Sequence, residues 1–357
     1  MPDLAFAVVG AGFWGEYQIA AWQEVAGARL IAVCDRDRSR AEEVARRFGV
    51  AKVYADAPEM LRLERLDFVD IAVGPEAHEP LVGLAASCGV PVICQKPMAL
   101  DHATCESMVR RCREAGVTFL VHENYRWQPP MRSVKRLLDA GRIGRPFRAH
   151  IQFSHGDLSF FDRQPYLYDQ PHFAMYDMGP HLFDLARFFF GEPQVLFARE
   201  SHLNRRFVGE DIVSVLLGYE GLTCHCELSW QTSGYDVFIE GEMGTITWNP
   251  NGRLVVRESN GEYIESLVPQ HYAWADPRYG FAHSSIVATS RHLLSSLRGE
   301  CLAETSGEDN LRTMWLLHLA LQSAKENAAL PVSRKSVEGL EGLSASRSST
   351  DPPAAGK

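Results

Sequence analysis

The chain has 357 residues, of which 46% are hydrophobic, and this is enough material for two packed domains. Its formal net charge of −9 argues against a nucleic-acid partner, because binding phosphates needs a basic surface. No apolar run reaches the roughly 18–20 residues of a membrane span. The N-terminus lacks the basic and apolar regions of a signal peptide. We therefore expect a cytoplasmic protein with no membrane partner.

The first third of the chain alternates apolar strand patterns with helical patterns. The expected strands cover residues 4–9, 30–34, 53–54, 68–73, 90–94 and 117–121. Alternation at this spacing predicts an α/β fold with a parallel, doubly wound sheet of the Rossmann type.

A glycine motif follows the first expected strand directly. It reads Gly10-Ala11-Gly12-Phe13-Trp14-Gly15 and opens a helical pattern, as the G-x-G-x-x-G fingerprint of dinucleotide binding requires. The first glycine allows a tight turn, the second lets the backbone approach a pyrophosphate, and the third lets the helix pack closely. The helix N-terminus offers N–H groups and a positive dipole end to the phosphates. We predict that the cofactor contacts Gly10, Gly12, Phe13, Trp14 and Gly15.

Asp35 ends the next strand, 20 residues after Gly15. A carboxylate at this distance binds the ribose hydroxyls of NAD in dinucleotide folds. Arg36 follows and can accept the 2′-phosphate of NADP. NAD is favoured, because Asp35 would repel that phosphate.

Gln95-Lys96-Pro97 follows the strand at 90–94. Ligands of open α/β sheets lie outside the carboxyl ends of the strands, so Lys96 is placed where a cofactor and a substrate meet. The loop Gly74-Pro75-Glu76-Ala77-His78 follows the preceding strand. The alternative is that Pro97 only ends the strand and that Lys96 is a solvated loop cation.

Together these motifs resemble the Gfo/Idh/MocA oxidoreductases. That family pairs a Rossmann domain with a C-terminal α+β domain on an open, mostly antiparallel sheet. The resemblance continues through Asp177-Met178-Gly179-Pro180-His181 and residues 238–245, and it covers about residues 4–332. It implies cofactor contacts from Asp35, Arg36, Gly74, Pro75, His78, Gln95 and Lys96. One departure is Gln95, since the family usually has glutamate there.

The second half continues with strand patterns that turn at glycines and predict a mostly antiparallel sheet. They cover residues 146–153, 194–202, 211–219, 222–230, 235–240, 245–248 and 254–258, and helical patterns cover 131–140, 284–297 and 308–327. We expect a Rossmann domain over 1–122, a substrate-binding and oligomerisation domain over 123–332, and a disordered tail over 333–357.

Two segments with polar and aromatic side chains are candidates for binding a polyhydroxylated ligand. One follows the strand at 117–121, and its alternative reading is a polar linker between domains. The other is a long segment without periodicity over 154–173, and such loops tend to be functional. Their predicted substrate contacts are Glu123, Asn124, Arg126, Trp127, His155 and Tyr166.

Asp177 and His181 lie four residues apart at the start of a helical pattern, which places them on one helix face. Pro180 is tolerated there only in the first turn. Histidine is the natural general base near neutral pH. The alternative is an aspartate that caps the helix beside an unrelated histidine.

The eight cysteines do not have the density of a disulfide scaffold. Cys224-His225-Cys226 lies in a strand pattern that puts both cysteines on one face, so we assign them to the core and expect no metal.

Within the family, four stretches are similar to the D-apiose dehydrogenases. They are Gln95-Lys96-Pro97, residues 121–126, Gln164-Pro165-Tyr166 and residues 184–187. The resemblance implies an NAD-dependent sugar dehydrogenase that oxidises a cyclic aldose such as D-apiose to a lactone, acting as a homodimer or homotetramer. In that role His181 takes the hydroxyl proton, Lys96 stabilises developing charge, and Asp177 binds a neighbouring hydroxyl and holds His181 in register. The alternatives are an inositol or polyol dehydrogenase, an NAD-dependent glycosidase, and a non-catalytic sensor that binds NAD and a sugar.

Overall fold

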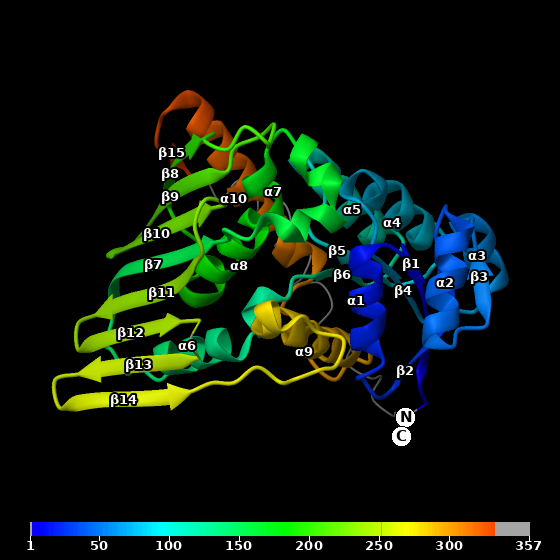
Figure 1. The fold of residues 1–357 in the computed structure, drawn as a ribbon, viewed down its shortest axis with the longest axis horizontal. Helices are drawn as coiled ribbons and strands as arrows, with labels where there is room; N and C mark the ends of the chain where they lie inside the picture. The colour runs from blue at the N-terminus through cyan, green and yellow to red at the C-terminus, as the bar shows by residue number, and fades with distance from the viewer. Residues whose placement is uncertain (1, 251, 333–357) are drawn as a thin grey trace, which may run out of the picture.

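Two β-sheets organise the molecule (Figure 1). The computed structural model describes residues 2–250 and 252–332, apart from the side chains of residues 160, 162 and 163. The tail predicted over 333–357 lies outside the described residues.

The first sheet is parallel throughout, with the strand order β3-β2-β1-β4-β5-β6. Its strands are β1 (Leu4–Val9), β2 (Ala28–Cys34), β3 (Lys52–Tyr54), β4 (Phe68–Ile71), β5 (Val92–Gln95) and β6 (Phe119–His122). The helices between them are α1 (Phe13–Trp22), α2 (Arg38–Phe48), α3 (Ala57–Leu63), α4 (His78–Ser87) and α5 (His102–Glu114). The strand order reverses between β1 and β4, and this confirms the predicted Rossmann sheet.

Both faces of the first sheet are buried, as its uninterrupted apolar strands require. Ala7 and Val9 join the core that contains side chains of α3, α4 and α5. Phe6 and Val8 point to the other face, in a core with side chains of α1 and α2. The alternation along β1 therefore supplies two cores from one strand.

The second sheet is mixed, with the order β14-β13-β12-β11-β7-β10-β9-β8-β15. Its strands are β7 (Pro146–Ser154), β8 (Val195–Ser201), β9 (Ile212–Tyr219), β10 (Leu222–Ser229), β11 (Gly234–Gly241), β12 (Gly244–Asn249), β13 (Arg253–Glu258), β14 (Gly261–Ser266) and β15 (Leu330–Pro331). All of these pairs are antiparallel except β7 with β10, which is parallel. The predicted open, mostly antiparallel sheet is confirmed.

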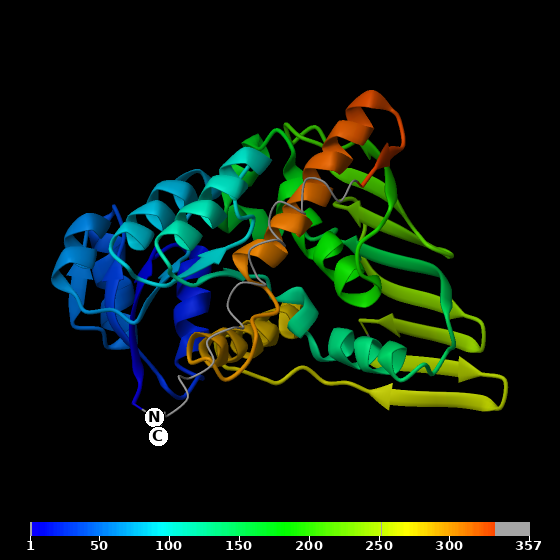
Figure 2. The same ribbon diagram turned by 180° about the vertical axis from the view of Figure 1, so that it is seen from behind.

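Helices pack on the side of the second sheet that faces the first domain (Figures 1 and 2). The helices of this half are α6 (Pro129–Asp139), α7 (Phe173–Asp177), α8 (Gly179–Phe190), α9 (Gly280–Leu297) and α10 (Gly307–Glu326). Short 3-10 turns are η1 (Pro75–Ala77), η2 (Tyr125–Trp127), η3 (Leu158–Arg163), η4 (Pro165–Asp169) and η5 (Pro277–Tyr279). None of the described helices is both long and apolar enough to cross a membrane.

The helices α9 and α10 return from the second half of the chain to the first sheet. Ile286 and Val287 of α9 are buried in the core that also contains Phe6 and Val8. Just before α10, Thr305 pairs with Val121 of β6, through a backbone hydrogen bond of 2.8 Å and a side-chain hydrogen bond of 2.8 Å. The carboxyl ends of β5 and β6 are thus held against the second domain.

One expected element differs from the structure. Asp177 is the last residue of α7, and a new helix, α8, begins at Gly179. Asp177 and His181 therefore do not share one helix face, because the helical structure is interrupted at Met178, between α7 and α8. Pro180 does lie in the first turn of α8, as predicted.

Substituting Gly10 with alanine should destabilise the first domain more than the same substitution at Gly49. Gly10 has φ of +109°, and an added Cβ would lie 2.4 Å from the carbonyl oxygen of Ala72. Gly49 also has a positive φ, +71°, but an added Cβ would meet nothing within 4 Å. In urea unfolding, Gly10→Ala should lower the free energy of unfolding by about 2–5 kcal/mol. Gly49→Ala should cost about 1 kcal/mol. Equal losses in the two variants would contradict the packing described for the glycine turn.

Candidate active site

The glycine motif forms a tight turn between β1 and α1. An alanine at position 15 would place Cβ 2.0 Å from the carbonyl oxygen of Gly10, so helix and turn are in close contact. At Gly12 an added Cβ meets nothing within 4 Å, and no side chain caps the N-terminus of α1. This open surface at a helix N-terminus suits a phosphate group.

Asp35 holds the end of β2 to the glycine turn. Its Oδ2 accepts from the backbone N–H of Ala11 at 2.8 Å, and its Oδ1 accepts from the N–H of Asp37 at 2.9 Å. Each carboxylate oxygen has a further lone pair for a ribose hydroxyl. Arg36 is exposed. The predicted ribose contact of Asp35 and the role of Arg36 stay predictions.

His78, a predicted cofactor contact, lies inside the protein among backbone carbonyl groups. It is fully buried, with its Nε2 3.0 Å from the carbonyl oxygen of Val73. Its Nδ1 lies 3.1 Å from the carbonyl oxygens of Pro97 and Met98. Burial is the main cause that lowers the pKa of His78. This histidine holds the loop after Lys96, while Gly74 is exposed and Pro75 is half-buried at the start of η1.

Gln95 belongs to a buried chain of hydrogen bonds that ends at the carboxyl group of Asp70. Its Oε1 accepts from the backbone N–H of Lys96 at 3.0 Å, and its Nε2 donates to Gln18 at 3.2 Å. Gln18 donates in turn to both oxygens of Asp70, at 2.9 and 3.0 Å, and Trp22 donates to Asp70 at 2.7 Å. Burial raises the pKa of Asp70 to about 7. An amide at position 95 suits this network, because a carboxylate there would add a second buried acid close to Asp70.

Lys96 reaches from the end of β5 to the end of α7. Its Nζ donates to the carbonyl oxygen of Asp177 at 2.7 Å and lies 3.5 Å from the Oδ1 of the same residue. Both side chains are largely buried. Residues 81 positions apart are thus joined across the two domains by one ammonium group.

His181 is buried in the first turn of α8, and Glu123 lies beside it. The His181 Nδ1 and the Glu123 Oε1 are 2.5 Å apart, and the imidazole stacks on the ring of Tyr125 at 3.8 Å. Burial raises the pKa of Glu123 to about 7. Burial first, and the charge of Lys96 second, lower the pKa of His181 well below 6.5. The partner of His181 is therefore Glu123, where the sequence indicated Asp177.

A cavity collects many of these side chains at the carboxyl end of the first sheet. It is lined by Trp14, Gln95, Lys96, His122, Asn124, Tyr125, His155, Asp177, Met178, His181, Trp230, Tyr279, Ala282, His283 and Ile286. The structure thus brings together Lys96, Asp177 and His181 with the predicted ligand contacts Asn124 and His155. His155 stacks on Trp230 at 4.8 Å, and burial lowers its pKa.

Three predicted substrate contacts lie outside this cavity. Arg126 is buried and forms a bidentate pair with Asp184, through Nε to Oδ2 at 2.9 Å and Nη2 to Oδ1 at 2.5 Å. Trp127 stacks beneath the guanidinium of Arg132, 3.4 Å from the ring centroid. Tyr166 is 49% exposed. A fourth, Glu123, is fully buried behind His181 and does not line the cavity. The directions of the Arg126 and Glu123 side chains depend on partners 58 residues along the chain.

Several residues that line the cavity were not predicted from the sequence. Tyr125, Trp230 and Tyr279 supply aromatic rings, and His283 lies in the first turn of α9. The only signal for His283 was its place one residue before the expected helix at 284–297. Nothing in the sequence distinguished the three aromatic residues from core residues.

Comparisons with known proteins agree with this geometry. Residues 4–123 match the model described as "Oxidoreductase family, NAD-binding Rossmann fold", and residues 131–247 match the "GFO/IDH/MocA C-terminal domain". D-apiose dehydrogenase of Paraburkholderia graminis is 37% identical over 93% of this chain and 90% of its own length. The chain belongs to the Gfo/Idh/MocA family. This confirms the resemblance drawn from the motifs.

Two further proteins are similar to this chain over most of its length. D-apiose dehydrogenase of Rhizobium rhizogenes is 37% identical over 93% of this chain and 98% of its own length. A crystal structure of an oxidoreductase from Agrobacterium radiobacter, in complex with NAD+, L-tartaric acid and magnesium, superposes with a TM-score of 0.89. It is 36% identical and covers 92% of this chain and 98% of its own.

Membership of the Gfo/Idh/MocA family confirms the predicted NAD-dependent oxidoreductase. The residues of this chain fit the cofactor. The open surface at Gly12, the uncapped start of α1 and the carboxylate of Asp35 suit the phosphates and a ribose. Trp14, which belongs to the glycine motif, lines the cavity. The ring of Phe13 packs on the ring of Trp14, with centroids 5.1 Å apart.

Replacing Arg126 should affect stability and leave substrate binding intact. Removing one partner of a buried ion pair typically costs about 3–5 kcal/mol, because the other charge stays buried. Arg126→Met should therefore lower the free energy of unfolding by about that amount, while the sugar KM stays within roughly twofold of the wild type. Arg145→Met, at an exposed arginine paired with Glu242, is the control and should change neither quantity. A large rise in KM at unchanged stability would restore Arg126 as a substrate contact.

Proposed function

We propose that this chain oxidises a cyclic aldose at its anomeric carbon to a lactone, with D-apiose as the first candidate. The observation that carries the proposal is the arrangement of Lys96, Asp177 and His181 on one cavity beside the glycine turn. Two D-apiose dehydrogenases at 37% identity support the choice of sugar.

In this reaction the anomeric C–H and O–H bonds break and a C=O bond forms. NAD+, when bound, supplies the hydride acceptor, and NADH and a proton are the other products. His181 takes the hydroxyl proton on its Nε2. That nitrogen is free to do so when the Nδ1 proton is donated to Glu123. Lys96 donates a hydrogen bond to the same hydroxyl oxygen and stabilises negative charge as it develops.

Glu123 positions the base in this scheme. A carboxylate bonded to Nδ1 fixes the tautomer whose Nε2 can accept a proton, as in other catalytic histidine pairs. Its Oε1 also accepts from the N–H of Tyr125 at 3.1 Å, which fixes the carboxylate in place. Its Oε2 is buried without a hydrogen-bond partner among the described residues. This incomplete solvation is consistent with the raised pKa of Glu123. Asp177, whose carbonyl holds Lys96, binds a neighbouring sugar hydroxyl.

The first experiment is an NADH-production assay with D-apiose, other aldoses and inositols, in which the product is identified by NMR. We expect NADH and a lactone from D-apiose. Lys96→Ala and His181→Ala should each lower kcat/KM at least about 100-fold. His202→Ala, an exposed histidine outside the cavity, is the control.

Each other outcome of this assay selects a different function. Undiminished turnover in both variants would overturn the site assignment. NADH with a keto product from an inositol would indicate a polyol dehydrogenase. Sugar release without net NADH would indicate a glycosidase, and binding of NAD and sugar without turnover would indicate a sensor.

The pH dependence tests the role of Glu123. Because burial raises the pKa of Glu123 to about 7, the Glu123–His181 pair takes up a proton as the pH falls through about 7. That proton removes the base, so kcat/KM for oxidation should rise with pH and level off above about 8. In Glu123→Gln this acid limb should move below pH 6.5, because the pKa of the remaining His181 is lowered, and kcat should fall about 10- to 100-fold.

Glu242→Gln, at an exposed glutamate, is the control for this measurement and should keep the wild-type profile. An unchanged acid limb in Glu123→Gln would show that the carboxylate does not govern the base.

We also propose that the protein works in the cytoplasm as a homodimer or homotetramer. All eight cysteines are free, and six of them are buried, which suits a reducing compartment. Analytical ultracentrifugation would measure the oligomeric state.

A further inference from the structure

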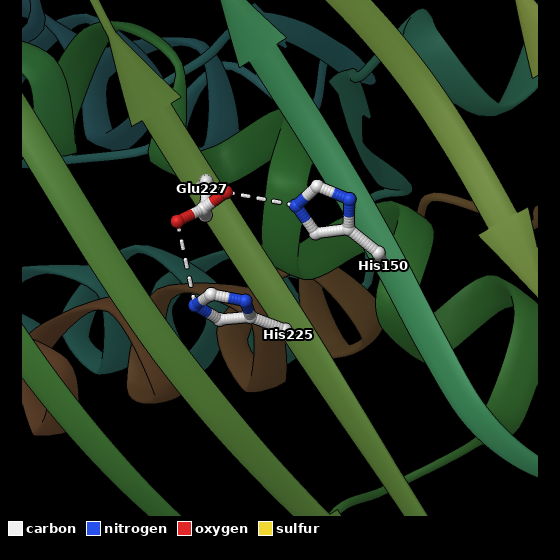
Figure 3. Close-up of side chains that lie close together, drawn as sticks. All are labelled: His150, His225 and Glu227. Atoms are coloured by element: carbon white, nitrogen blue, oxygen red, sulfur yellow. Dashed lines mark hydrogen bonds and ion pairs between the residues drawn. The ribbon is translucent and has the colours of Figure 1, made fainter.

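Three metal-ligating side chains gather on the second sheet, on the face that carries the half-buried residues. His150 belongs to β7, and His225 and Glu227 belong to β10. The Nε2 of His150 lies 2.8 Å from one oxygen of Glu227, and the Nε2 of His225 lies 3.5 Å from the other. Figure 3 shows the carboxylate between the two imidazoles, each of which turns a nitrogen toward it. This cluster uses none of the residues of the cavity described above.

The alternation of β10 explains why these side chains meet. Cys224 and Cys226 point into the core, so His225 and Glu227 point to the opposite face. The parallel pairing places His225 directly beside His150. The segment that resembled a cysteine metal motif thus presents its histidine to a different set of ligands.

We propose that His150, His225 and Glu227 bind a divalent transition-metal ion of the zinc type, outside the catalytic centre. Two imidazole nitrogens and one carboxylate oxygen are a donor set that zinc prefers. In tetrahedral coordination with bonds of about 2.0–2.1 Å, ligand atoms lie about 3.3 Å apart. The separations of 2.8 and 3.5 Å, measured to the two different oxygens of Glu227, are of this size. With one ligand atom from each side chain, all three atoms lie within 4.8 Å of one another.

Neighbouring groups support the ligands in the way that a metal site requires. The other ring nitrogen of His150, Nδ1, faces the carboxylate of Asp236 on β11 at 3.9 Å. The hydroxyl of Ser214 on β9 donates to Glu227 at 3.4 Å. A carboxylate behind a ligating imidazole orients the ring and raises its basicity. The three ligands are half-buried, so a fourth position is open to water.

The position of the cluster indicates what the ion would do. His150 and His225 lie on β7 and β10, which form the parallel pair of an otherwise antiparallel sheet. Parallel pairing is slightly less stable per residue than antiparallel pairing. An ion held by both strands would join them by a bond that exists only in the folded state, and would therefore stabilise the sheet. This inference does not depend on the proposed sugar chemistry.

A second group, His172, Glu200 and Glu210, is a weaker candidate. One oxygen of Glu210 already accepts from the backbone N–H of Met175 at 2.9 Å, His172 is half-buried, and Glu200 is exposed. It serves as a comparison in the experiment.

The test is isothermal titration of the metal-stripped full chain with Zn²⁺, together with the absorption spectrum after Co²⁺ addition and thermal unfolding. We expect one Zn²⁺ per chain with a Kd of about 10 μM or tighter. We also expect visible Co²⁺ bands of four-coordinate geometry and a Tm raised by about 3 °C or more at saturation. Mg²⁺ should give no shift, because it prefers oxygen ligands in an octahedral site.

Variants assign the ion to this cluster. His150→Ala, His225→Ala and Glu227→Gln should each weaken Zn²⁺ binding at least 100-fold, and His172→Ala should leave it unchanged. A cooperative thermal unfolding transition of each variant without metal confirms that it is folded. The same side chains can also be held without an ion, by two neutral imidazoles that donate to Glu227. Absence of Zn²⁺ binding to the wild type, or Zn²⁺ binding that persists in all three variants, would overturn the proposal.

Discussion

The buried contact between Glu123 and His181 joins the end of β6 to the first turn of α8. The proposed proton transfer to His181 depends on this contact. Burial first, and the charge of Lys96 second, lower the pKa of His181 well below 6.5 and favour the neutral imidazole. In the proposed mechanism, Glu123 fixes which ring nitrogen of His181 carries the proton. Lys96 itself is held by the carbonyl of Asp177 across the domain boundary. The packing of α9 and α10 against the first sheet keeps these ends together.

Most of the fold follows from local patterns. The apolar strands of the first sheet and the glycine turn have a period and a spacing that predict a Rossmann sheet, and the structure has it. The strand β14 was not predicted, and its side chains are almost all exposed. An edge strand with no buried face has no alternation to detect. The helical pattern predicts a helix that begins at Asp177, whereas α7 ends at Asp177 and α8 begins at Gly179.

The site was predictable only in part. Lys96, Asp177 and His181 follow from motif positions at strand and helix ends, and the cavity brings them together. The directions of Arg126 and Glu123 do not follow from such positions. Their partners, Asp184 and His181, lie 58 residues away in each case, and only the packed structure shows them. The same limit applies to His225, whose neighbour His150 comes from another strand.

The protonation state of His181 tests most directly whether this histidine is the base and whether Glu123 holds it. ¹⁵N NMR of histidine-labelled protein, titrated from pH 5 to 9 and assigned with His181→Ala, reports the proton on each ring nitrogen. We predict a neutral ring at pH 8 with the proton on Nδ1 and none on Nε2, and proton uptake by the pair near pH 7. An imidazolium at pH 8, or a neutral ring with its proton on Nε2, would contradict the assignment of His181 as the base held by Glu123.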